Sequence, residues 1–559
     1  MFKMRALAAT LTLAAALSSG VHAINKITRS GRYLYDSGGT RFYMKGVAYQ
    51  EQGAVLATTG PFSEPSTFID PLANDTACAR DVPVLQSLGV NTVRVYSVNN
   101  TLNHDSCMQA LSNAGIYTII DLTLPVNGSI DRASPEWTTN LLDLYIGTIN
   151  SFAKYDNVLA YNVGNEVVTA ANETSALTFV KAAARDVKAY LNSKSLNILV
   201  GYAAIDMDST LLGPLANYLA CDASGQGSGN NAIDLFGLNN YEWCGDSTFQ
   251  QSYAAKTQLF QNFNVVAYFS EYGCPTPSPR GWTEVGALFS TDMSPVWSGG
   301  MAFSYFPATS DQGSFGMVTI NGNQVQTSQD FDNLKAQYGQ ASGPNSPSQS
   351  SAGSSTYPAC PAQSTNLLVS NTLPPTPNDA ACDCLQNSLS CQFTPTTSNT
   401  TGILGPLLDT ACSLIGTAGG NCNAISGSGS SGQYGAASGC DPSVKLSFVM
   451  SQFYEANNRD PQSCSFGGNG TVNTAAPSSV TAANNVASSC LASATGTSVP
   501  TAPSSAGGSS SSTGSGQNSG SNGGNSNSAM SAILGETRGL YGAAAMFVIT
   551  LATGCYVLA

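Results

Sequence analysis

The stretch "AYNVGNEVVTA" (Ala160–Ala170) contains an apolar run that stops at a glycine and is followed by an Asn–Glu pair. A segment that buries its side chains and then presents a carboxylate is typical of a parallel β-strand whose carboxyl end faces a site. Outward from this stretch, similar apolar runs recur along the chain. There are eight, at residues 42–49, 91–98, 116–124, 157–166, 197–203, 233–241, 265–273 and 299–306.

Helix-like segments lie between several of these runs. Residues 172–194 repeat Ala, Leu and Val at three- and four-residue spacing, which predicts an amphipathic helix. Eight buried strands alternating with helices favour an α/β fold of the (β/α)8 TIM-like barrel type over residues 24–340. A doubly wound open sheet is the alternative, but no glycine-rich phosphate loop follows the first run.

The two ends of the chain have the features of processing signals. Residues 1–23 combine Lys3 and Arg5 with an apolar stretch and small residues, which predicts a secretory signal peptide. At the other end, small residues, a polar spacer and a hydrophobic tail from Leu540 predict a GPI-attachment signal. We expect attachment at Asn527 and removal of residues 529–559. A plain C-terminal membrane span is the alternative.

Composition divides the rest of the chain. Residues 341–375 begin with a stretch rich in Ser, Pro and Gly, which predicts a linker, and residues 493–528 form a Ser/Gly-rich stalk predicted to be disordered. Between them, residues 376–492 are dense in cysteine, which predicts a small disulfide-rich module. Its cysteines are Cys382, Cys384, Cys391, Cys412, Cys422, Cys440, Cys464 and Cys490.

The cysteine count agrees with a secreted chain. Of the 15 cysteines, Cys555 lies in the predicted tail, and the other 14 can all pair in an oxidising compartment. The sequence also contains six N-glycosylation sequons, at Asn74, Asn99, Asn127, Asn172, Asn399 and Asn469. We therefore expect a glycoprotein tethered by lipid to the extracellular face of the plasma membrane, or passed on to the cell wall.

Charge and histidine content exclude several functions. The formal net charge is −13 and the pI is about 4.5, so nucleic acid is not an expected partner. Only His22 and His104 are present, and the first leaves with the signal peptide. One histidine and disulfide-bonded cysteines do not provide a zinc site, and no G-x-S-x-G motif accompanies His104. We expect a monomer without metal or cofactor, in which carboxylates perform the acid–base chemistry.

Two carboxylates occupy equivalent positions on the predicted barrel. Glu166 ends the fourth apolar run and Glu271 ends the seventh, so both lie at the carboxyl-terminal rim where barrel enzymes place their active sites. A pair of carboxylates is what glycoside hydrolysis requires. A separation of about 5 Å between them leads to retention of configuration through a covalent glycosyl-enzyme.

Further polar and aromatic residues accompany the pair. Asn165 is placed to bind the sugar hydroxyl next to the reacting carbon, and Arg94 to hold Glu271 ionised. Arg94 could instead form a structural ion pair, and tyrosines at strand ends often only cap a core. The remaining candidates for sugar contact at strand ends are Tyr96, Asp121, Asn239, Tyr241 and Tyr305.

The motifs "GVAYQ", "NTVRVYSV", "YNVGNEV", "LNNYEWCG" and "FSEYGC" together resemble the fungal GPI-anchored β-1,3-glucanosyltransferases, glycoside hydrolase family 72. The resemblance implies an enzyme that cuts inside a β-1,3-glucan and joins the new reducing end to the non-reducing end of another chain. It implies that Glu166 is the acid/base and Glu271 the nucleophile. It also implies a donor site lined by Tyr96, Asn165 and Tyr241, with Gln50 and Asp121 as candidate subsite contacts.

The cysteine-rich segment is similar to the X8-type carbohydrate-binding module that some members of this family carry, most clearly at residues 446–470. By the same resemblance, Cys78 pairs with Cys107, Cys244 with Cys274, and Cys221 with Cys360. Pairing within the module stays open, because eight cysteines allow 105 connectivities.

Two other functions remain as alternatives. An endo-β-1,3-glucanase forms the same glycosyl-enzyme and differs only in that water, rather than a sugar hydroxyl, attacks it. A non-catalytic wall protein that binds glucan through the module is a third possibility. The presence of both Glu166 and Glu271 with their polar neighbours argues against it.

Overall fold

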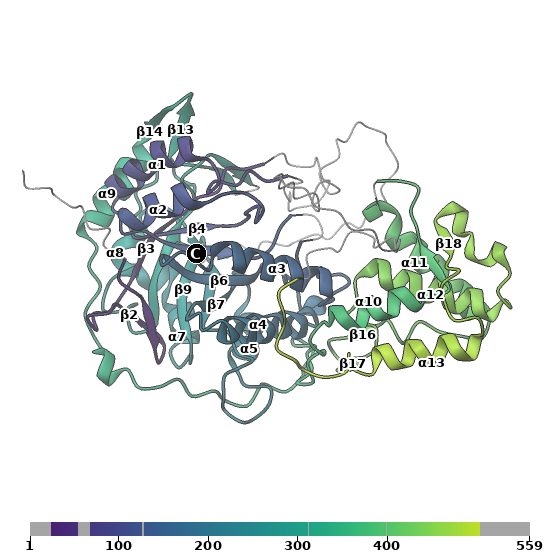
Figure 1. Ribbon diagram of the computed structural model, residues 1–559. Helices are drawn as coiled ribbons and strands as arrows, with labels where there is room; N and C mark the ends of the chain where they lie inside the picture. Colours follow the sequence, from purple (N-terminus) through teal and green to yellow (C-terminus); the bar gives the residue numbers. More distant parts are fainter. Residues whose placement is uncertain (1–23, 54–66, 126–127, 311, 399, 504–559) are drawn as a thin grey trace, which may run out of the picture.

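The computed structural model describes residues 24–53, 67–125, 128–310, 312–398 and 400–503, so the predicted signal peptide, most of the stalk and the anchor signal lie outside the described residues. Eight parallel strands close into a barrel in chain order, with the last strand beside the first (Figure 1). The predicted (β/α)8 barrel is confirmed. Its strands are β3 (Met44–Ala48), β4 (Thr92–Val95), β5 (Tyr117–Asp121), β6 (Val158–Asn165), β7 (Leu199–Ile205), β8 (Leu235–Asn239), β9 (Val266–Tyr272) and β10 (Trp297–Ala302).

Helices surround the barrel, and the sequence shows where the first of them begins and ends. The side chain of Asn74 accepts a hydrogen bond from the Ala77 N–H, and Gly89 closes the helix with φ of 84°. The helices are α1 (Asp75–Leu88), α2 (Asp105–Asn113), α3 (Thr139–Phe152), α4 (Ala176–Ser193), α5 (Ser209–Ala220), α6 (Phe249–Ser252), α7 (Ala254–Leu259), α8 (Glu284–Leu288) and α9 (Gln329–Gln340).

Three hairpins complete this domain. The first, β1 (Thr28–Ser30) with β2 (Tyr33–Tyr35), brings Leu34 into an apolar cluster with strand residues such as Ile119. The other two follow the last barrel strand. They are β11 (Ala308–Ser310) with β12 (Gly313–Phe315), and β13 (Val318–Asn321) with β14 (Gln324–Thr327).

Alternation along the strands separates the outer core from the barrel interior. On β4, Val93 and Val95 belong to the large core that includes residues of the surrounding helices, whereas Arg94 between them bonds Asp121 and Asn239 of other strands. The inner apolar cluster contains Ile119, and Asp121 lies two residues further along β5. The interior therefore changes from apolar to polar toward the carboxyl ends of the strands.

The cysteine-rich module packs against one side of the barrel (Figure 1). The Thr139 N–H at the start of α3 donates to the Gly439 carbonyl at 2.9 Å, and Thr178 Oγ1 on α4 donates to the Gly429 carbonyl at 2.8 Å. The elements of the module are α10 (Asp379–Ser388), β15 (Cys391–Phe393), α11 (Thr400–Thr417), β16 (Gly427–Ser428), β17 (Gln433–Tyr434), α12 (Pro442–Ala456), β18 (Gly470–Val472) and α13 (Val480–Leu491).

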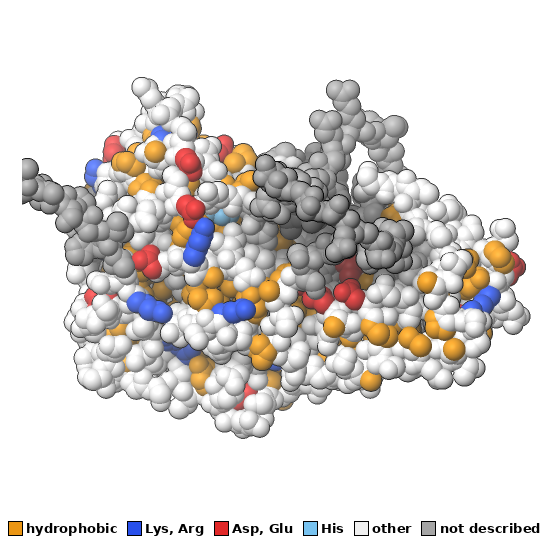
Figure 2. All heavy atoms as spheres, viewed as in Figure 1, with side chains coloured by type: hydrophobic (Ala, Val, Ile, Leu, Met, Phe, Trp, Pro, Cys, Tyr) orange, Lys and Arg blue, Asp and Glu red, His pale blue; other side chains and the backbone are white. Residues whose placement is uncertain are grey.

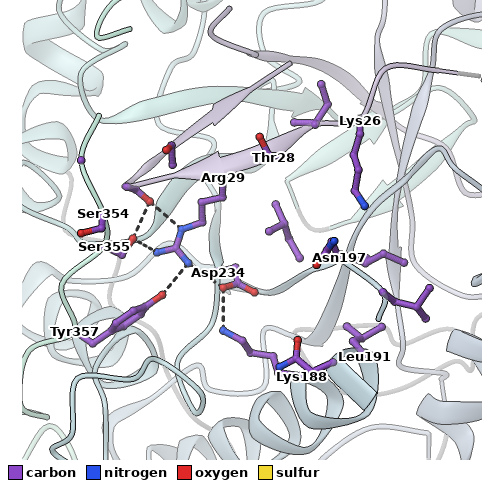
Figure 3. Close-up of a pocket in the computed structure, with 18 residues that line it drawn as sticks. Lys26, Thr28, Arg29, Lys188, Leu191, Asn197, Asp234, Ser354, Ser355 and Tyr357 are labelled. Atoms are coloured by element: carbon purple, nitrogen blue, oxygen red, sulfur yellow. Dashed lines mark hydrogen bonds and ion pairs between the residues drawn. The ribbon is translucent and has the colours of Figure 1, made fainter. Parts of the chain in front are cut away.

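The predicted linker is held against the barrel along its length. The hydroxyls of Tyr43 and Tyr35 donate to the carbonyls of Pro344 and Pro347 at 2.8 and 2.9 Å. Further on, the segment borders a cavity of about 650 Å³ that also contains Arg29 (Figure 3). Composition indicated a linker, and the structure adds that barrel side chains satisfy its backbone carbonyls. None of the helices in the described ranges is both long and apolar enough to cross a bilayer.

Candidate active site

Glu166 is the first residue after β6 and adopts a left-handed backbone conformation with φ of 49°. The Glu166 N–H donates to the Ala203 carbonyl at 2.9 Å, and Arg132 Nη2 donates to the Glu166 carbonyl at 2.8 Å. A non-glycine residue with positive φ is strained and is usually held by its surroundings. These two hydrogen bonds tie the strained turn to β7 and to the segment after β5.

Glu271 lies within β9 and accepts hydrogen bonds from three donors. The Tyr96 hydroxyl donates to Oε1 and the Tyr241 hydroxyl to Oε2, each at 2.8 Å, and Arg94 Nη1 approaches Oε1 at 3.3 Å. An ionised carboxylate only accepts hydrogen bonds, whereas a protonated carboxyl must also donate one. This set of donors therefore fits an ionised Glu271.

Glu166 has a different environment. Asn239 Nδ2 donates to its Oε1 at 2.6 Å. Burial, followed by the charge of Glu271, raises the pKa of Glu166 to about 7, and Asn239, Arg94 and then Arg132 act in the opposite direction. A carboxyl with this pKa holds a proton near neutral pH, so Glu166 is suited to act as an acid.

Arg94 affects Glu271 less than the sequence suggested. Burial raises the pKa of Glu271, and Arg94, Tyr96 and Tyr241 oppose that rise without cancelling it. The guanidinium is fully buried and is shared among several acceptors. In addition to Glu271, these are Asp121 Oδ2 at 2.7 Å, Asn165 Oδ1 at 2.8 Å, the Ser270 carbonyl at 3.2 Å and Asn239 Oδ1 at 3.4 Å.

Burial divides the predicted sugar contacts into two groups. Tyr96, Asn165, Tyr241 and Gln50 are partly exposed and can reach a ligand. Four other candidates are buried below the rim and bond neighbouring protein groups, so their contact with sugar stays a prediction. These residues are Arg94, Asp121, Asn239 and Tyr305, with exposed fractions of 0, 1, 3 and 0%.

Asp121 pairs with Arg94. Its Oδ1 accepts from Asn162 Nδ2 at 2.6 Å, and its Oδ2 pairs with the guanidinium. Tyr305 lies in a separate cluster, where its hydroxyl donates to Asp81 Oδ1 at 3.0 Å. Tyr49 donates to the other oxygen of that carboxylate at 2.9 Å. Asp121 and Tyr305 therefore both bond protein groups, and their contact with sugar stays a prediction.

Sequence reasoning missed Phe303. The strand β10 ends at Ala302, so Phe303, and not Tyr305, is the aromatic residue at its end. Its half-buried ring makes edge contacts with the rings of Tyr96 and Tyr241, with centroids 6.4 Å apart in both cases. The only available signal was its place in "MAFSYF", where the end of the strand is not visible.

Gln50 holds one of these tyrosines in place. Its Oε1 accepts from the N–H groups of Tyr96 and Ser97 at 3.1 and 3.0 Å, and its Nε2 donates to the Ile69 carbonyl at 2.6 Å. All of its partners, the Glu51 carbonyl included, belong to the backbone. Gln50 therefore fixes the segment that presents Tyr96, whatever contact it makes with a ligand.

Disulfides restrain the loops around the site and stabilise the module. Cys244–Cys274 joins the loops that follow β8 and β9, close to Glu271. Cys78–Cys107 and Cys221–Cys360 are the other two pairs that the resemblance implied, and the second ties the end of α5 to the linker. In the module the pairs are Cys382–Cys440, Cys384–Cys490, Cys391–Cys464 and Cys412–Cys422.

The predicted modification sites lie partly within the described residues. Asn74 and Asn172 are exposed, and Asn99 and Asn469 are partly exposed. Asn127, Asn399 and the predicted anchor residue Asn527 fall outside the described residues. Within the described ranges, no group of His, Cys, Asp and Glu side chains is arranged to hold a metal ion.

Comparison with known proteins places the chain in a family. Residues 14–342 match the family model described as glucanosyltransferase, glycoside hydrolase family 72, and residues 389–471 match the X8 domain. The 1,3-beta-glucanosyltransferase gas1 of Schizosaccharomyces pombe is 39% identical over 485 residues, which cover 86% of this chain and 83% of that protein. Protein EPD1 of Candida maltosa is 39% identical over 456 residues, covering 81% and 78%.

Solved structures agree with this result. The ligand-free Gas2 protein of Saccharomyces cerevisiae has a TM-score of 0.73 and 34% identity, covering 84% of this chain and 97% of that one. The same protein in complex with laminaritetraose and laminaripentaose has a TM-score of 0.71 and 34% identity, covering 84% and 99%. The chain therefore belongs to the glucanosyltransferase family, glycoside hydrolase family 72.

Proposed function

We propose that this chain is a retaining β-1,3-glucanosyltransferase that elongates cell-wall glucan. The observation that carries the proposal is the unequal hydrogen bonding of the two carboxyls. Among the described residues, Glu271 accepts from three donors and Glu166 from one. Such a difference assigns separate acid and nucleophile roles to two otherwise similar groups. The relatives named 1,3-beta-glucanosyltransferases and the laminari-oligosaccharides bound to Gas2 support the substrate class.

The first step breaks a glycosidic bond inside the donor. Protonated Glu166 gives its proton to the glycosidic oxygen, while an oxygen of Glu271 attacks the anomeric carbon from the opposite side. The bond from that carbon to the leaving oxygen breaks, and the reducing-end fragment departs with the proton. The remaining glucan is then bound to Glu271 as an ester-linked glycosyl-enzyme.

The second step joins the glucan to an acceptor. Glu166, now ionised, takes the proton from the 3-hydroxyl at the non-reducing end of another β-1,3-glucan. The acceptor oxygen attacks the anomeric carbon, and the bond to Glu271 breaks. Two inversions give net retention, and Glu166 and Glu271 both return to their starting states.

Neighbouring residues hold this geometry. Glu271 loses its negative charge when the glycosyl-enzyme forms and regains it when that bond breaks. The carboxylate is stabilised by hydrogen bonds from the hydroxyls of Tyr96 and Tyr241 and by the guanidinium of Arg94. Asn165 Oδ1 accepts from Arg94 at 2.8 Å, which directs its Nδ2 as the donor to the adjacent sugar hydroxyl.

Transfer and hydrolysis can be separated by their products. The secreted protein is incubated with one reduced β-1,3-gluco-oligosaccharide, and mass spectrometry follows the products over time. Products both longer and shorter than the input indicate transfer. Only shorter products would establish the endo-β-1,3-glucanase. Absence of products together with retained glucan binding would contradict the enzyme assignment.

We further propose that the mature chain begins after Ala23 and is attached at Asn527 to a GPI lipid on the extracellular face of the plasma membrane. The face seen in Figure 2 is mostly uncharged, with its Lys and Arg side chains spaced apart, and this suits an uncharged polysaccharide partner. Release of the protein from membranes by phosphatidylinositol-specific phospholipase C tests the anchor. Retention after treatment would favour a membrane span.

A further inference from the structure

The carboxamide of Asn239 connects the two catalytic carboxyls. Its Oδ1 accepts from Ser270 Oγ at 2.6 Å and from Arg94 Nη1 at 3.4 Å. Its Nδ2 donates to Glu166 Oε1 at 2.6 Å and to Asn165 Oδ1 at 3.2 Å. Because a guanidinium only donates, Oδ1 must be the atom that faces Arg94, which fixes the orientation of the amide.

The neighbourhood of Ser270 is built to fit its hydroxyl. Ser270 is fully buried on β9, immediately before Glu271. On the adjacent strand, a Cβ added to Gly237 would lie 2.5 Å from the Ser270 Cβ and 2.6 Å from its Oγ. Only glycine leaves room for the hydroxyl at this place. A buried hydroxyl is costly without a partner, and its partner here is Asn239.

We propose that Ser270 is a positioning residue, whose hydroxyl keeps the Asn239 carboxamide turned so that Nδ2 faces Glu166. The inference rests on the proposed acid/base role of Glu166. A flipped amide would direct its NH₂ toward the hydrogens of Arg94, and its oxygen toward Glu166. Arg94, which only donates, selects the oxygen for this side of the amide, and the shorter bond from Ser270 at 2.6 Å holds the carboxamide in that orientation.

This orientation determines which oxygen of Glu166 carries the proton. Asn239 Nδ2 donates a hydrogen bond to Glu166 Oε1. The other oxygen, Oε2, is therefore the one that binds the proton and delivers it to the leaving oxygen. The same hydrogen bond stabilises the ionised form that the second step requires. Other groups act on Glu166 through their charge or their proximity. They are Glu271 on β9, Arg94 on β4, Arg132 after β5, Tyr202 on β7 and Tyr241 after β8.

The test compares two buried serines in the full secreted protein. Ser270→Ala removes the proposed contact. Ser298→Ala is the matched control, because Ser298 on β10 is equally buried and its Oγ has no hydrogen-bond partner among the described residues. For Ser270→Ala we expect kcat to fall about 5- to 20-fold with KM changed less than about twofold. The basic limb of the pH–activity profile should move upward by about half a unit to one unit.

Two further variants separate positioning from packing. Ser270→Thr retains a hydroxyl and should restore both kcat and the pH profile, and Ser270→Cys should lie between Ser and Ala because a thiol is a weaker donor. In an Asn239→Ala background, Ser270→Ala should have no further effect on the basic limb, because its proposed partner is already absent.

Three outcomes would overturn the proposal. The first is a pH–activity profile of Ser270→Ala identical to that of Ser298→Ala, and the second is a shift of the basic limb by Ser270→Ala that is equally large in the Asn239→Ala background. The third is failure of Ser270→Thr to restore the parent pH–activity profile. If Ser270→Ala does not fold, the comparison of Ser270→Thr with Ser270→Cys decides by the same criterion. Failure of the proposed acid/base role of Glu166 would be a separate result. It would appear as full activity of the Glu166→Gln variant, independently of the results for the Ser270 variants.

Discussion

The barrel contains two arginine clusters, one at each end, that look alike and serve different purposes. At the catalytic end, Arg94 is fully buried and pairs with Asp121 and Glu271. At the opposite end, Arg29 pairs with Asp234 at 2.9 Å and donates to Tyr357 and Ser355 of the linker (Figure 3). Both arginines connect segments that are far apart in the sequence.

The two clusters differ in their balance of charge. Around Asp234, Arg29 and Lys188 both lie at 2.9 Å, so two cations share one carboxylate. Backbone carbonyls and the hydroxyls of Tyr357 and Ser355 accept from the remaining donors. Around Arg94, one cation faces two carboxylates, and Glu166 is close enough that the charge of Glu271 raises its pKa. A cluster with surplus positive charge keeps its carboxylate ionised and stabilises the fold, whereas surplus negative charge in a buried place favours binding of a proton that can be transferred.

The largest expected effect is on catalysis at the Arg94 end. Glu271→Gln and Glu166→Gln should each lower kcat at least about 1,000-fold, because the first removes the nucleophile and the second the transferable proton. Asp234→Asn is the matched carboxylate change at the Arg29 end and should leave kcat within about twofold. Turnover of a reduced β-1,3-gluco-oligosaccharide measures all three. Equal losses at both ends would remove the distinction between the clusters.

The second effect separates two tyrosines. Tyr241→Phe deletes a donor to Glu271 and should lower kcat about 10- to 100-fold. Tyr305→Phe deletes a donor to Asp81 and should change kcat less than about threefold, with a loss of stability of about 1 kcal/mol. Kinetics and thermal unfolding on both variants check this. A greater catalytic loss for Tyr305→Phe would return that residue to the site.

The third effect is on stability at the Arg29 end. Arg29→Ala should lower the free energy of unfolding by about 1–3 kcal/mol, since the linker loses its donors while Asp234 keeps Lys188. The kcat of the folded enzyme should not change. Thermal unfolding and initial rates measure both quantities. A loss of kcat at a temperature where the variant is fully folded would show that the two ends are coupled.

The smallest effect depends on pH. The pKa of Glu166 is raised to about 7 from its ordinary value of 4.5, so the stability that its carboxyl contributes is fully present below pH 4.5 and is lost as the pH rises through about 7. Glu166→Gln does not lose stability in this way, because its side chain does not titrate. The variant should therefore gain a few degrees of Tm over the parent at pH 7.5 and none at pH 4.5. A constant difference between the two pH values would contradict the raised pKa.

Much of the fold could be predicted from the sequence, because continuous apolar runs mark strands that are buried on both faces. The positions of Glu166 and Glu271 followed from strand ends on a barrel. The depth of each side chain could not be predicted. Asp121 and Tyr305 also lie near strand ends, but their burial depends on how the barrel closes around Arg94 and on where β10 stops at Ala302.

The proposed contribution of Ser270 could not be predicted from the sequence for a related reason. A serine in "YFSEYG" has no periodic or compositional signal, and its meaning comes from the space left by Gly237 on the adjacent strand. The linker shows the same limit, because Ser, Pro and Gly content predicts a connection but not the tyrosines and arginines that hold it. Contacts between segments distant in sequence account for these omissions.

The most direct test of the unequal carboxyls is azide rescue of the two alanine variants on an activated β-1,3-gluco-oligosaccharide. In Glu166→Ala the glycosyl-enzyme still forms on Glu271, so azide should attack it and give the β-glycosyl azide. In Glu271→Ala azide takes the place of the nucleophile and should give the α-glycosyl azide. Nuclear magnetic resonance distinguishes the two products. The opposite assignment of products would show that the roles of Glu166 and Glu271 are reversed.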